Sequence, residues 1–249
     1  MLKEERHQYI LKKLLENRKV ISLELQKELQ VSDDTIRRDL QELADIGLIK
    51  KVHGGAIPKP ELPYNMNERL HVSETEKQII AEKAIGLFSD DQVIILDNGS
   101  TNLLVAKLLP STLKATIFTN SLLIAHELVT HPEVETIMLG GKIFKQAQAA
   151  VGIETVESLA MIRADWCLIG VCSIHPEIGV TSQSREESQV KRKMVEVSQK
   201  IIATTTYDKM NTAENFLVCT TESLDILITD DRIEKASLQP YEKMDIQIL

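Results

Sequence analysis

The segment VISLELQKELQVSDDTIRRDLQELADIGLIKKVHGGA, residues 20–56, decides the fold of the N-terminal part of the chain. Ser32 offers a side-chain oxygen to cap a helix that begins at the next residue, and two aspartates in the first turn suit the positive end of the helix dipole. Apolar residues then recur at the i, i+4 and i+7 spacing of a buried helical stripe, at Ile36, Leu40 and Leu43. The segment therefore predicts an amphipathic helix over 33–45.

The polar residues of this helix point away from the apolar stripe, since successive residues turn by about 100°. They are Thr35, Arg37, Arg38 and Gln41, with Ser32 at the helix start. Hydroxyl, amide and guanidinium groups on one helix face are the groups that read base edges and contact phosphates in a major groove. The pattern therefore predicts a DNA-recognition helix.

Short elements around this helix complete a helix-turn-helix domain. Helices are expected over about 3–16 and 22–29, and Val31 is expected to fill the angle before the recognition helix. Gly47 is suited to end that helix, and residues 48–55 predict a small β-wing. The basic side chains of the wing are expected at the DNA backbone or minor groove: Lys50, Lys51 and His53. The alternatives are an ordinary three-helix domain whose arginines are only solvated and a helix-turn-helix module that binds protein.

The same segment resembles the N-terminal winged helix of the DeoR family of bacterial transcriptional regulators. The run TIRRDL followed at this distance by HGGA is highly specific to that family. Arg18-Lys19 stands where the family usually has a glycine before the short strand, a change expected to alter a turn and to leave the binding mode intact. The matching residues are Glu5-Arg6, Ile10-Leu11, Val31-Ser32, Thr35-Ile36-Arg37-Arg38-Asp39-Leu40, Gly47-Leu48 and His53-Gly54-Gly55-Ala56.

Composition sets the broad class of protein. The 249 residues are 43% hydrophobic, enough for two buried cores, and the net charge is −8. Residues 1–60 hold 12 Lys and Arg against 10 Asp and Glu, whereas the remaining residues hold 17 against 27. This charge balance argues against a protein that binds nucleic acid over its whole surface. It permits a basic face on the N-terminal helix-turn-helix domain. Three cysteines without paired short spacing predict reduced thiols, and no metal or cofactor is expected.

A winged helix-turn-helix domain is expected over 1–56, followed by a semi-rigid linker over 57–72 that carries three prolines. Short apolar runs alternate with helical patterns in the remainder. This alternation predicts an α/β domain over 73–249 with a mostly parallel sheet covered by helices on both faces. Strands are expected at 93–97, 115–119, 135–140, 165–171, 200–205 and 225–229, and helices at 76–88, 101–109 and 122–130.

Small and polar residues follow three of these strands, at the sheet edge where α/β proteins bind ligands. The amides of Ser100 and Thr101 open a helix and predict a phosphate site, and Gly99 is expected to let the backbone approach the ligand. The chain lacks GxGxxG and GKS/T motifs, which disfavours dinucleotide and nucleoside triphosphate sites. A pocket for a small anionic polyol is expected from Asp97, Asn98, Gly99, Ser100, Thr101, Thr119, Asn120, Ser121, Gly140 and Gly141. Each loop taken alone is equally compatible with a helix cap.

Residues 76–230 resemble the effector domain of the same family, whose fold is similar to ribose-5-phosphate isomerase. The resemblance implies phosphosugar sensing, with Lys209 as the cation for a ligand phosphate and Glu187 as a further effector contact. The chain departs from the family at Ser173-Ile174-His175, where a Gly-Ile-Asp stretch is usual, and at Thr206, where aspartate is usual. Further matching positions are Asp165, Gly170, Gly179, Thr181 and Lys191.

Two pairs of side chains are candidates for other chemistry. Cys172 and His175 follow a predicted strand and are of the types that act as nucleophile and base, but no third orienting group is identifiable. The related isomerases have aspartates where this chain has these two residues, so no pair of acid and base carboxylates is evident. Glu187 and Lys191 lie at i and i+4 on a predicted helix, and a solvated ion pair is expected there.

The hypothesis from the sequence is a DNA-binding transcriptional regulator rather than an enzyme. It is expected to repress carbohydrate genes and to leave its double-stranded operator when a phosphorylated sugar or sugar acid binds. One short recognition helix reads few base pairs, so a homodimer or larger homo-oligomer is expected. Without a targeting segment or a membrane-spanning apolar run, a cytoplasmic protein is expected. The alternatives are an isomerase-like enzyme with a DNA-binding domain and an effector-independent DNA-binding protein.

Overall fold

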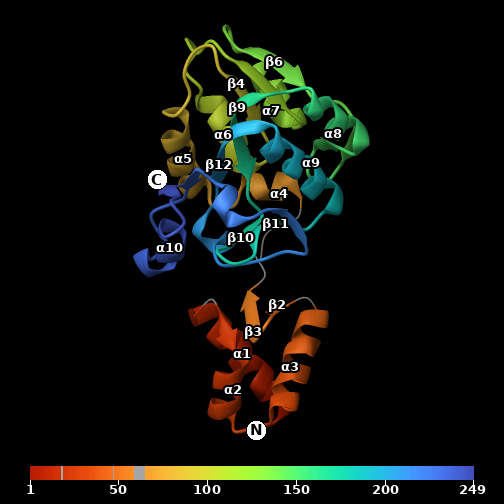
Figure 1. Ribbon diagram of the computed structural model, residues 1–249, viewed down its shortest axis with the longest axis vertical. Coiled ribbons are helices and arrows are strands. Elements are labelled where there is room, and N and C mark those ends of the chain that lie inside the picture. Colours follow the sequence, from red (N-terminus) through yellow and green to blue (C-terminus); the bar gives the residue numbers. More distant parts are fainter. Residues whose placement is uncertain (18, 47, 59–64) are drawn as a thin grey trace.

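Three helices and a small antiparallel sheet form the N-terminal lobe of the computed structural model, which describes residues 1–17, 19–46, 48–58 and 65–249 (Figure 1). The predicted helices and wing are confirmed, and the wing extends through Pro58. The predictions for Arg18, Gly47, Pro60 and Pro63 lie outside the described residues. The helices are α1 (Lys3–Asn17), α2 (Ser22–Leu29) and α3 (Asp33–Asp45), and the strands β1 (Val20–Ile21), β2 (Ile49–Val52) and β3 (Gly55–Pro58) pair in the order β1-β3-β2.

The apolar stripe of α3 closes the core of this lobe. Ile36, Leu40 and Leu43 are at most 1% exposed, and they share one cluster with Leu25 of α2. Val31 packs partly buried against the same cluster, as predicted for the turn between α2 and α3. Since full burial of one such side chain contributes about 1.5–3 kcal/mol, this stripe is a principal reason why the helices stay together.

A seven-stranded sheet forms the core of the second lobe, and all of its strand pairs are parallel. The strand order is β15-β14-β12-β9-β4-β5-β6. The six strands predicted from apolar runs are confirmed, and the two-residue β15 is an addition. The strands are β4 (Val93–Leu96), β5 (Thr116–Thr119), β6 (Glu135–Met138), β9 (Ala164–Gly170), β12 (Ser198–Thr204), β14 (Ile226–Ile228) and β15 (Gln247–Ile248).

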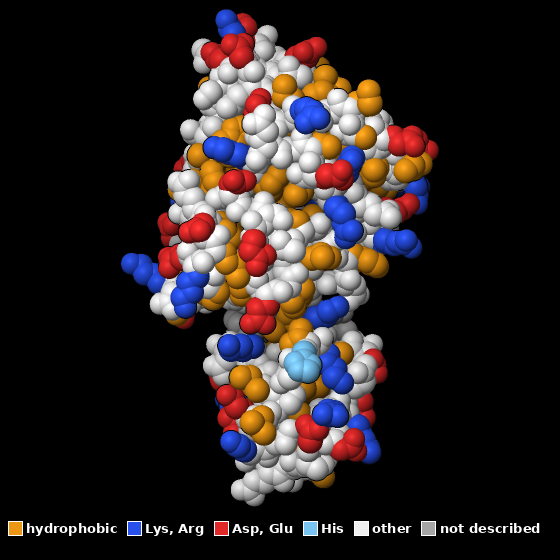
Figure 2. Space-filling model, viewed as in Figure 1, with side chains coloured by type: hydrophobic (Ala, Val, Ile, Leu, Met, Phe, Trp, Pro, Cys, Tyr) orange, Lys and Arg blue, Asp and Glu red, His pale blue; other side chains and the backbone are white. Residues whose placement is uncertain are grey.

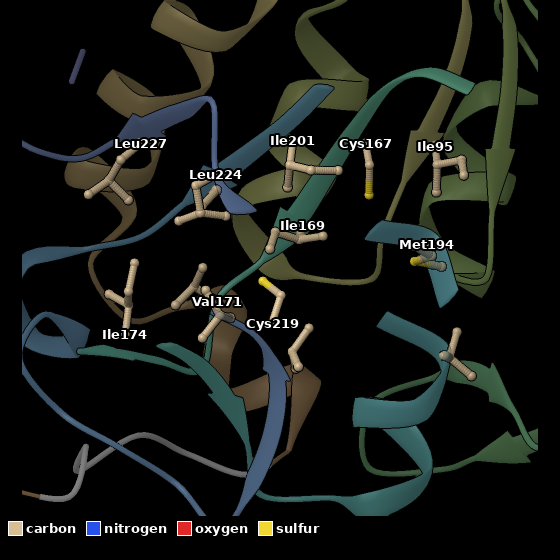
Figure 3. Packing of buried hydrophobic residues seen from close by; sticks show 14 of the residues in the cluster. Ile95, Cys167, Ile169, Val171, Ile174, Met194, Ile201, Cys219, Leu224 and Leu227 are labelled. Atoms are coloured by element: carbon tan, nitrogen blue, oxygen red, sulfur yellow. The ribbon is translucent and has the colours of Figure 1, made fainter. Parts of the chain in front are cut away.

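Helices cover both faces of the sheet, because successive residues of a strand point to opposite sides. Ile94 and Leu96 of β4 belong to one apolar cluster, whereas Ile95 belongs to the other. Figure 3 shows the second cluster, in which Ile95 and Met194 lie in one packed layer. The first cluster includes α4 (Met66–Leu70), α5 (Glu74–Ile85), α6 (Ser100–Leu108) and α7 (Leu122–Leu128), and the second includes α8 (Ile153–Ala160), α9 (Arg185–Glu196) and α10 (Lys235–Glu242).

Two groups of short antiparallel strands were not expected from the sequence. Unlike the strands of the parallel sheet, these strands do not alternate with helices, so the pattern that predicted the parallel sheet does not mark them. They are the hairpin of β7 (Lys142–Phe144) and β8 (Ala149–Val151), and a sheet of β10 (Ser173–His175), β11 (Gly179–Ser182) and β13 (Phe216–Cys219); the single turns η1 (Tyr207–Lys209) and η2 (Thr221–Ser223) complete the lobe. In the described part of the chain, no helix is long and apolar enough to cross a membrane.

The segment 57–72, predicted as a linker, contributes regular structure at both ends. Residues 57–58 belong to β3, and α4 occupies most of 65–72. Met66 is fully buried in the cluster of α5 and α6, and its backbone N donates a hydrogen bond to Gln146 O at 2.7 Å. Helix α4 is therefore packed as part of the second lobe.

Candidate functional site

The outward face of α3 carries the side chains predicted to contact DNA. Ser32 Oγ accepts a hydrogen bond from Thr35 N at 3.3 Å and caps the helix as expected. Arg37, Arg38 and Gln41 are exposed, and each arginine pairs with the aspartate four residues earlier, at 2.8 Å and 2.5 Å. Exposed pairs of this kind contribute little, so the guanidinium groups are available to exchange these partners for phosphates or base edges.

Charge over the surface is mixed. Figure 2 shows basic and acidic side chains interspersed on the visible face of both lobes. With a net charge of −8, the chain has no general attraction for DNA. Any DNA contact would therefore depend on the local set of donors on α3 and the wing.

The wing places its two lysines on opposite sides, because successive strand residues alternate. Lys51 Nζ donates to Gln41 Oε1 at 3.1 Å and so joins the outward face of α3. Lys50 Nζ instead donates to Asn215 Oδ1 of the second lobe at 2.7 Å, and His53 lines the cleft between the lobes. The structure thus brings Lys51 together with the recognition face and directs Lys50 and His53 to the second lobe.

A buried carboxylate holds α3 in place, a role that was not predicted for it. Asp39 is 3% exposed and accepts two hydrogen bonds from Arg6 of α1, at 2.7 Å and 3.0 Å, and His7 lies 3.2 Å away. A bidentate arginine–carboxylate pair fixes orientation as well as distance. The pair therefore sets the angle at which α3 leaves the helical core.

A small cavity lies in the second lobe, at the sheet edge where β4 and β9 end. Its volume is about 20 Å³, enough for one water molecule. Six of the residues predicted to bind an effector line it: Asn98, Gly99, Ser100, Thr101, Glu187 and Lys209. Six other lining residues were not in the predicted set: Arg69, Gly170, Val171, Cys172, Lys191 and Thr204.

An ion pair lies at the base of this cavity. Asp97 Oδ2 accepts from Gly170 N at 2.9 Å and pairs with Lys191, whose Nζ also donates to Gly170 O at 2.9 Å. Burial opposes the charge of Lys191, but nearby Asp97, together with Cys172 and Glu187, raises the pKa of this lysine above its usual value. The prediction of a solvated Glu187–Lys191 pair is wrong, since both residues are buried and Lys191 pairs with Asp97.

Close packing of two strand ends explains a glycine beside this pair. A Cβ at Gly170 would lie 2.6 Å from Asn98 O, so a larger residue would push β4 and β9 apart. At Gly99, predicted to permit close approach to a ligand, a Cβ would meet Gly170 Cα at 3.6 Å, an ordinary contact. Close packing therefore requires glycine at position 170 and does not require it at position 99.

Several polar groups around the cavity lack partners. Burial lowers the pKa of Lys209, as do the charges of Arg69 and Lys191, while Cys172 and Asp208 oppose this shift. Burial also raises the pKa of Glu187. Among the described residues, no hydrogen-bond partner reaches Arg69 Nε, Asn98 Oδ1 or Asp97 Oδ1, and no side chain caps the first amides of α6. Arg69 Nε is thus a buried donor without an acceptor, and Asn98 Oδ1 and Asp97 Oδ1 are buried acceptors without donors.

The remaining predicted effector residues lie outside the cavity lining and bond to the protein itself. Asn120 Oδ1 accepts from Asn98 N at 3.1 Å, and its Nδ2 donates to Ala150 O at 3.2 Å. Ser121 Oγ caps α7, and Thr119 Oγ1 accepts from Ser121 N. Gly140 and Gly141 lie beside Thr155, whose Oγ1 donates to Gly140 O at 2.7 Å. The structure does not bring these residues together with the cavity.

Cys172 and His175 line different spaces. Cys172 faces the small cavity, whereas His175 lines the cleft between the lobes, and burial lowers the pKa of His175. His175 Nδ1 accepts from Glu177 N at 3.2 Å. Cys172 and His175 therefore do not face each other, as a catalytic nucleophile and its base would. The part of the chain that the structure describes also holds no cluster of three metal-ligating His, Cys, Asp or Glu residues.

Arg69 is the cavity residue that the sequence reading missed most completely. It falls in the segment 57–72, where prolines favour a linker, yet it belongs to α4 and reaches the cavity. The spacing of Met66 and Leu70 at i and i+4 was the available signal of a short packed helix.

Comparison with known proteins adds independent information on the whole chain. A family model described as the DeoR C terminal sensor domain matches residues 72–231, and a model of the DeoR-like helix-turn-helix domain matches residues 6–59. The HTH-type transcriptional regulator GolR of Listeria innocua is 34% identical over 246 residues, which cover 98% of this chain and 97% of that protein. The glycerol-3-phosphate regulon repressor of Escherichia coli K12 is 28% identical over 210 residues, which cover 84% of this chain and 83% of that protein.

Solved structures resemble the second lobe more distantly. Ribose 5-phosphate isomerase A of Methanocaldococcus jannaschii is 15% identical with a TM-score of 0.40, over 55% of this chain and 54% of that chain.

Proposed function

The chain belongs to the DeoR family of transcriptional regulators, and from this premise we propose that it is an operator-binding repressor of carbohydrate genes. In this proposal, α3 and Lys51 bind double-stranded DNA, and a phosphorylated sugar or sugar acid occupies the cavity at the end of β4. Binding of that effector lowers affinity for the operator. The name of the Escherichia coli relative, a repressor of a glycerol-3-phosphate regulon, agrees in chemical class.

The observation that carries the effector proposal is the surplus of positive charge and free donors at the cavity. Lys191 is already paired with Asp97, whereas the Lys209 ammonium has no carboxylate within ion-pair distance among the described residues. The uncapped amides that begin α6 face the same space. A phosphate would accept hydrogen bonds from these amides and offset the charge of Lys209, while Glu187 would bind a hydroxyl.

The size of the cavity supports a switch. The cavity of about 20 Å³ is small beside a sugar phosphate, so the side chains around it are expected to adjust when the ligand binds. Occupied and empty forms of the sensor domain then differ in conformation. A ligand that binds the two forms with different affinity shifts the balance between them, which is the requirement for control of DNA binding.

A thermal-shift screen tests the effector proposal. The full chain is heated with a panel of sugar phosphates, each paired with its unphosphorylated sugar. A ligand present at 100 times its dissociation constant stabilises the native state by about 2.7 kcal/mol, so a true effector gives a clear rise in Tm. Equal effects of the phosphorylated and free sugars, or no effect of any member, would contradict the proposal.

The matched variants are Lys209→Met, which removes the charge at the cavity, and Lys200→Met, which removes a lysine stacked on Trp166 elsewhere on the sheet. The effector should stabilise Lys200→Met as it does the wild type and should stabilise Lys209→Met far less. DNA fragments retained by the purified protein supply the operator, and gel-shift titration then shows whether the same effector releases it.

Two-fold assembly is part of the proposal, because one α3 contacts few base pairs and paired half-sites extend the readout. Sedimentation of the full chain should show a dimer or larger species, and the retained DNA should carry two half-sites one or more helical turns apart. A monomer that binds DNA one to one would overturn this part.

One observation favours the isomerase-like alternative: Glu187 is buried at the cavity and its pKa is raised, as for a general acid. Proton NMR of each stabilising sugar phosphate after incubation with the protein separates the two functions. An unchanged ligand supports a sensor, and conversion to the isomeric sugar supports an enzyme.

A further inference from the structure

We propose that Arg69 binds the anionic group of the effector, and that Lys77 fixes the backbone of Arg69 so that α4 conveys occupancy of the cavity toward the DNA-binding lobe. This inference rests on the proposed function. It adds the residue that binds the anion and the helix whose position depends on anion binding. Its basis is the place of α4 in the chain, directly after the DNA-binding lobe, and the contacts at its C-terminal end.

Helix α4 is the first helix of the second lobe, and six residues, 59–64, join it through Asn65 to the end of β3. The wing strand β3 pairs with β2, which carries Lys51 of the recognition face. Helix α4 is therefore the element of the second lobe that follows the wing directly in the sequence. No other element of the sensor domain is so close to the wing along the chain.

The guanidinium group of Arg69 lies at the cavity, and not all of its N–H donors have hydrogen-bond acceptors. Its Nε is buried and has no hydrogen-bond acceptor among the described residues. Arginine presents its donors in a planar fork that matches two oxygens of a phosphate or carboxylate, whereas a lysine offers a single point of charge. An anion in the cavity would accept hydrogen bonds from the Arg69 guanidinium group. These bonds would pull the C-terminal end of α4 toward the cavity.

Lys77 of α5 holds that end of α4 from the other side. Lys77 is 4% exposed, and its Nζ donates to the carbonyl oxygens of Arg69 and Val72. A cation at the C-terminal carbonyls of a helix is favourable for the helix dipole and satisfies acceptors that have no partner within the helix. Lys77 is thus a positioning residue: it bonds to the backbone of Arg69 and does not line the cavity.

The charges in this region make the arrangement sensitive to an anion. Burial lowers the pKa of Lys77 to about 8, and the charges of Lys209 and Arg69 add to that effect. Lys77, Lys209 and Arg69 therefore lie in one region together with the carboxylates of Asp208 and Glu74, which oppose the lowering. A bound anion relieves the repulsion among the three cations and so stabilises the packing of α4 against α5.

Hydrogen exchange of the full-length protein tests the response of α4 without any substitution. Inorganic phosphate is the probe, because it presents the group that Arg69 is proposed to bind. Phosphate should slow exchange of the backbone amides in 66–72 and leave those of α8 unchanged. Bound phosphate with unchanged exchange in 66–72 would overturn the role of α4.

Three variants then separate binding from transmission, with phosphate affinity measured by calorimetry and operator affinity by fluorescence anisotropy. Arg69→Met should weaken phosphate binding about ten-fold or more, which corresponds to about 1.4 kcal/mol, and Arg69→Lys should recover part of it. Lys77→Met should bind phosphate with nearly wild-type affinity, but phosphate should no longer change its affinity for the operator. Arg163→Met, at an exposed arginine of the same lobe, should behave as the wild type.

The outcomes distinguish this inference from the proposed function. Wild-type protein that binds neither phosphate nor any sugar phosphate overturns both. Two results would overturn this inference alone and leave the effector site in place. One is an Arg69→Met variant that binds phosphate with wild-type affinity. The other is a Lys77→Met variant in which phosphate still changes operator affinity as it does in the wild type.

Discussion

Removal of the Lys191 ammonium should be among the most destabilising single changes in the sensor domain. Lys191 and Asp97 have side chains that are 5% and 1% exposed, and they pair with each other at the base of the cavity. In Lys191→Met, Asp97 keeps one hydrogen bond, from Gly170 N, and its Oδ1 has no partner among the described residues. The substitution therefore leaves a buried carboxylate almost without compensation.

The expected loss is about 3–5 kcal/mol at neutral pH, the cost of removing one partner from a buried ion pair. The loss also includes the acceptor Gly170 O, which Lys191 Nζ bonds at 2.9 Å. Urea unfolding followed by tryptophan fluorescence measures it directly. The chain has a single tryptophan, Trp166, and it lies in β9 of the same sheet, so the signal reports on this domain.

Lys193→Met is the matched control, since Lys193 lies on the same helix and pairs with Glu196, which is 65% exposed. Its loss should stay below about 1 kcal/mol, as for other surface pairs. The double variant Asp97→Asn with Lys191→Met removes both charges and should recover much of the stability. A loss below about 1 kcal/mol in Lys191→Met, or no recovery in the double variant, would refute the reasoning.

The other predictions concern DNA binding and pH. Arg37→Ala and Arg38→Ala should each weaken operator binding by about 1–3 kcal/mol in gel-shift titration, while the Tm changes little because both side chains are exposed; unchanged affinity at matched salt would remove α3 as the recognition helix. Lys51→Ala should weaken binding to all DNA sequences and reduce the salt slope by about one, whereas Lys50→Ala should change the slope less because Lys50 bonds to the second lobe; equal slopes would contradict the assignment of the two lysines. The folded pKa of Lys77, about 8, lies below the ordinary value of 10.5, so the unfolded chain holds the proton over the interval between them. Wild-type stability should therefore rise relative to Lys77→Met as pH increases from 8 toward 10.5, by at most about 1.4 kcal/mol per pH unit, and parallel stability curves would exclude the shift.

Local patterns allowed much of the fold to be predicted. The bounds of α2 and α3 follow from cap and stripe residues such as Ser32 and Ile36, and the parallel sheet follows from apolar runs between helices. The short strands β7, β8, β10, β11 and β13 were not predicted, because they do not follow the alternation of apolar runs and helices that marks the parallel sheet.

The candidate cavity was predicted in part, for a related reason. Residues 98–101 directly follow a strand and begin a helix, so their place at the sheet edge follows from the order of the elements. Thr119 to Ser121 follow the neighbouring strand in the same way, but their side chains bond to the protein and lie outside the cavity lining. Sequence order places a loop at an edge, whereas side-chain partners decide which groups remain free.

Helix periodicity, caps and apolar runs are properties of neighbouring residues, and they suffice to specify the winged helix, the α/β class and the place of residues 98–101 at the end of a strand. Contacts between residues far apart in the chain required the tertiary structure. Packing of α4 brings Arg69 to the cavity, Lys191 pairs with Asp97 across 94 positions, and strand alternation divides Lys51 from Lys50. Such contacts depend on how whole elements pack, because burial and charge compensation are satisfied in three dimensions and leave no fixed spacing in the sequence.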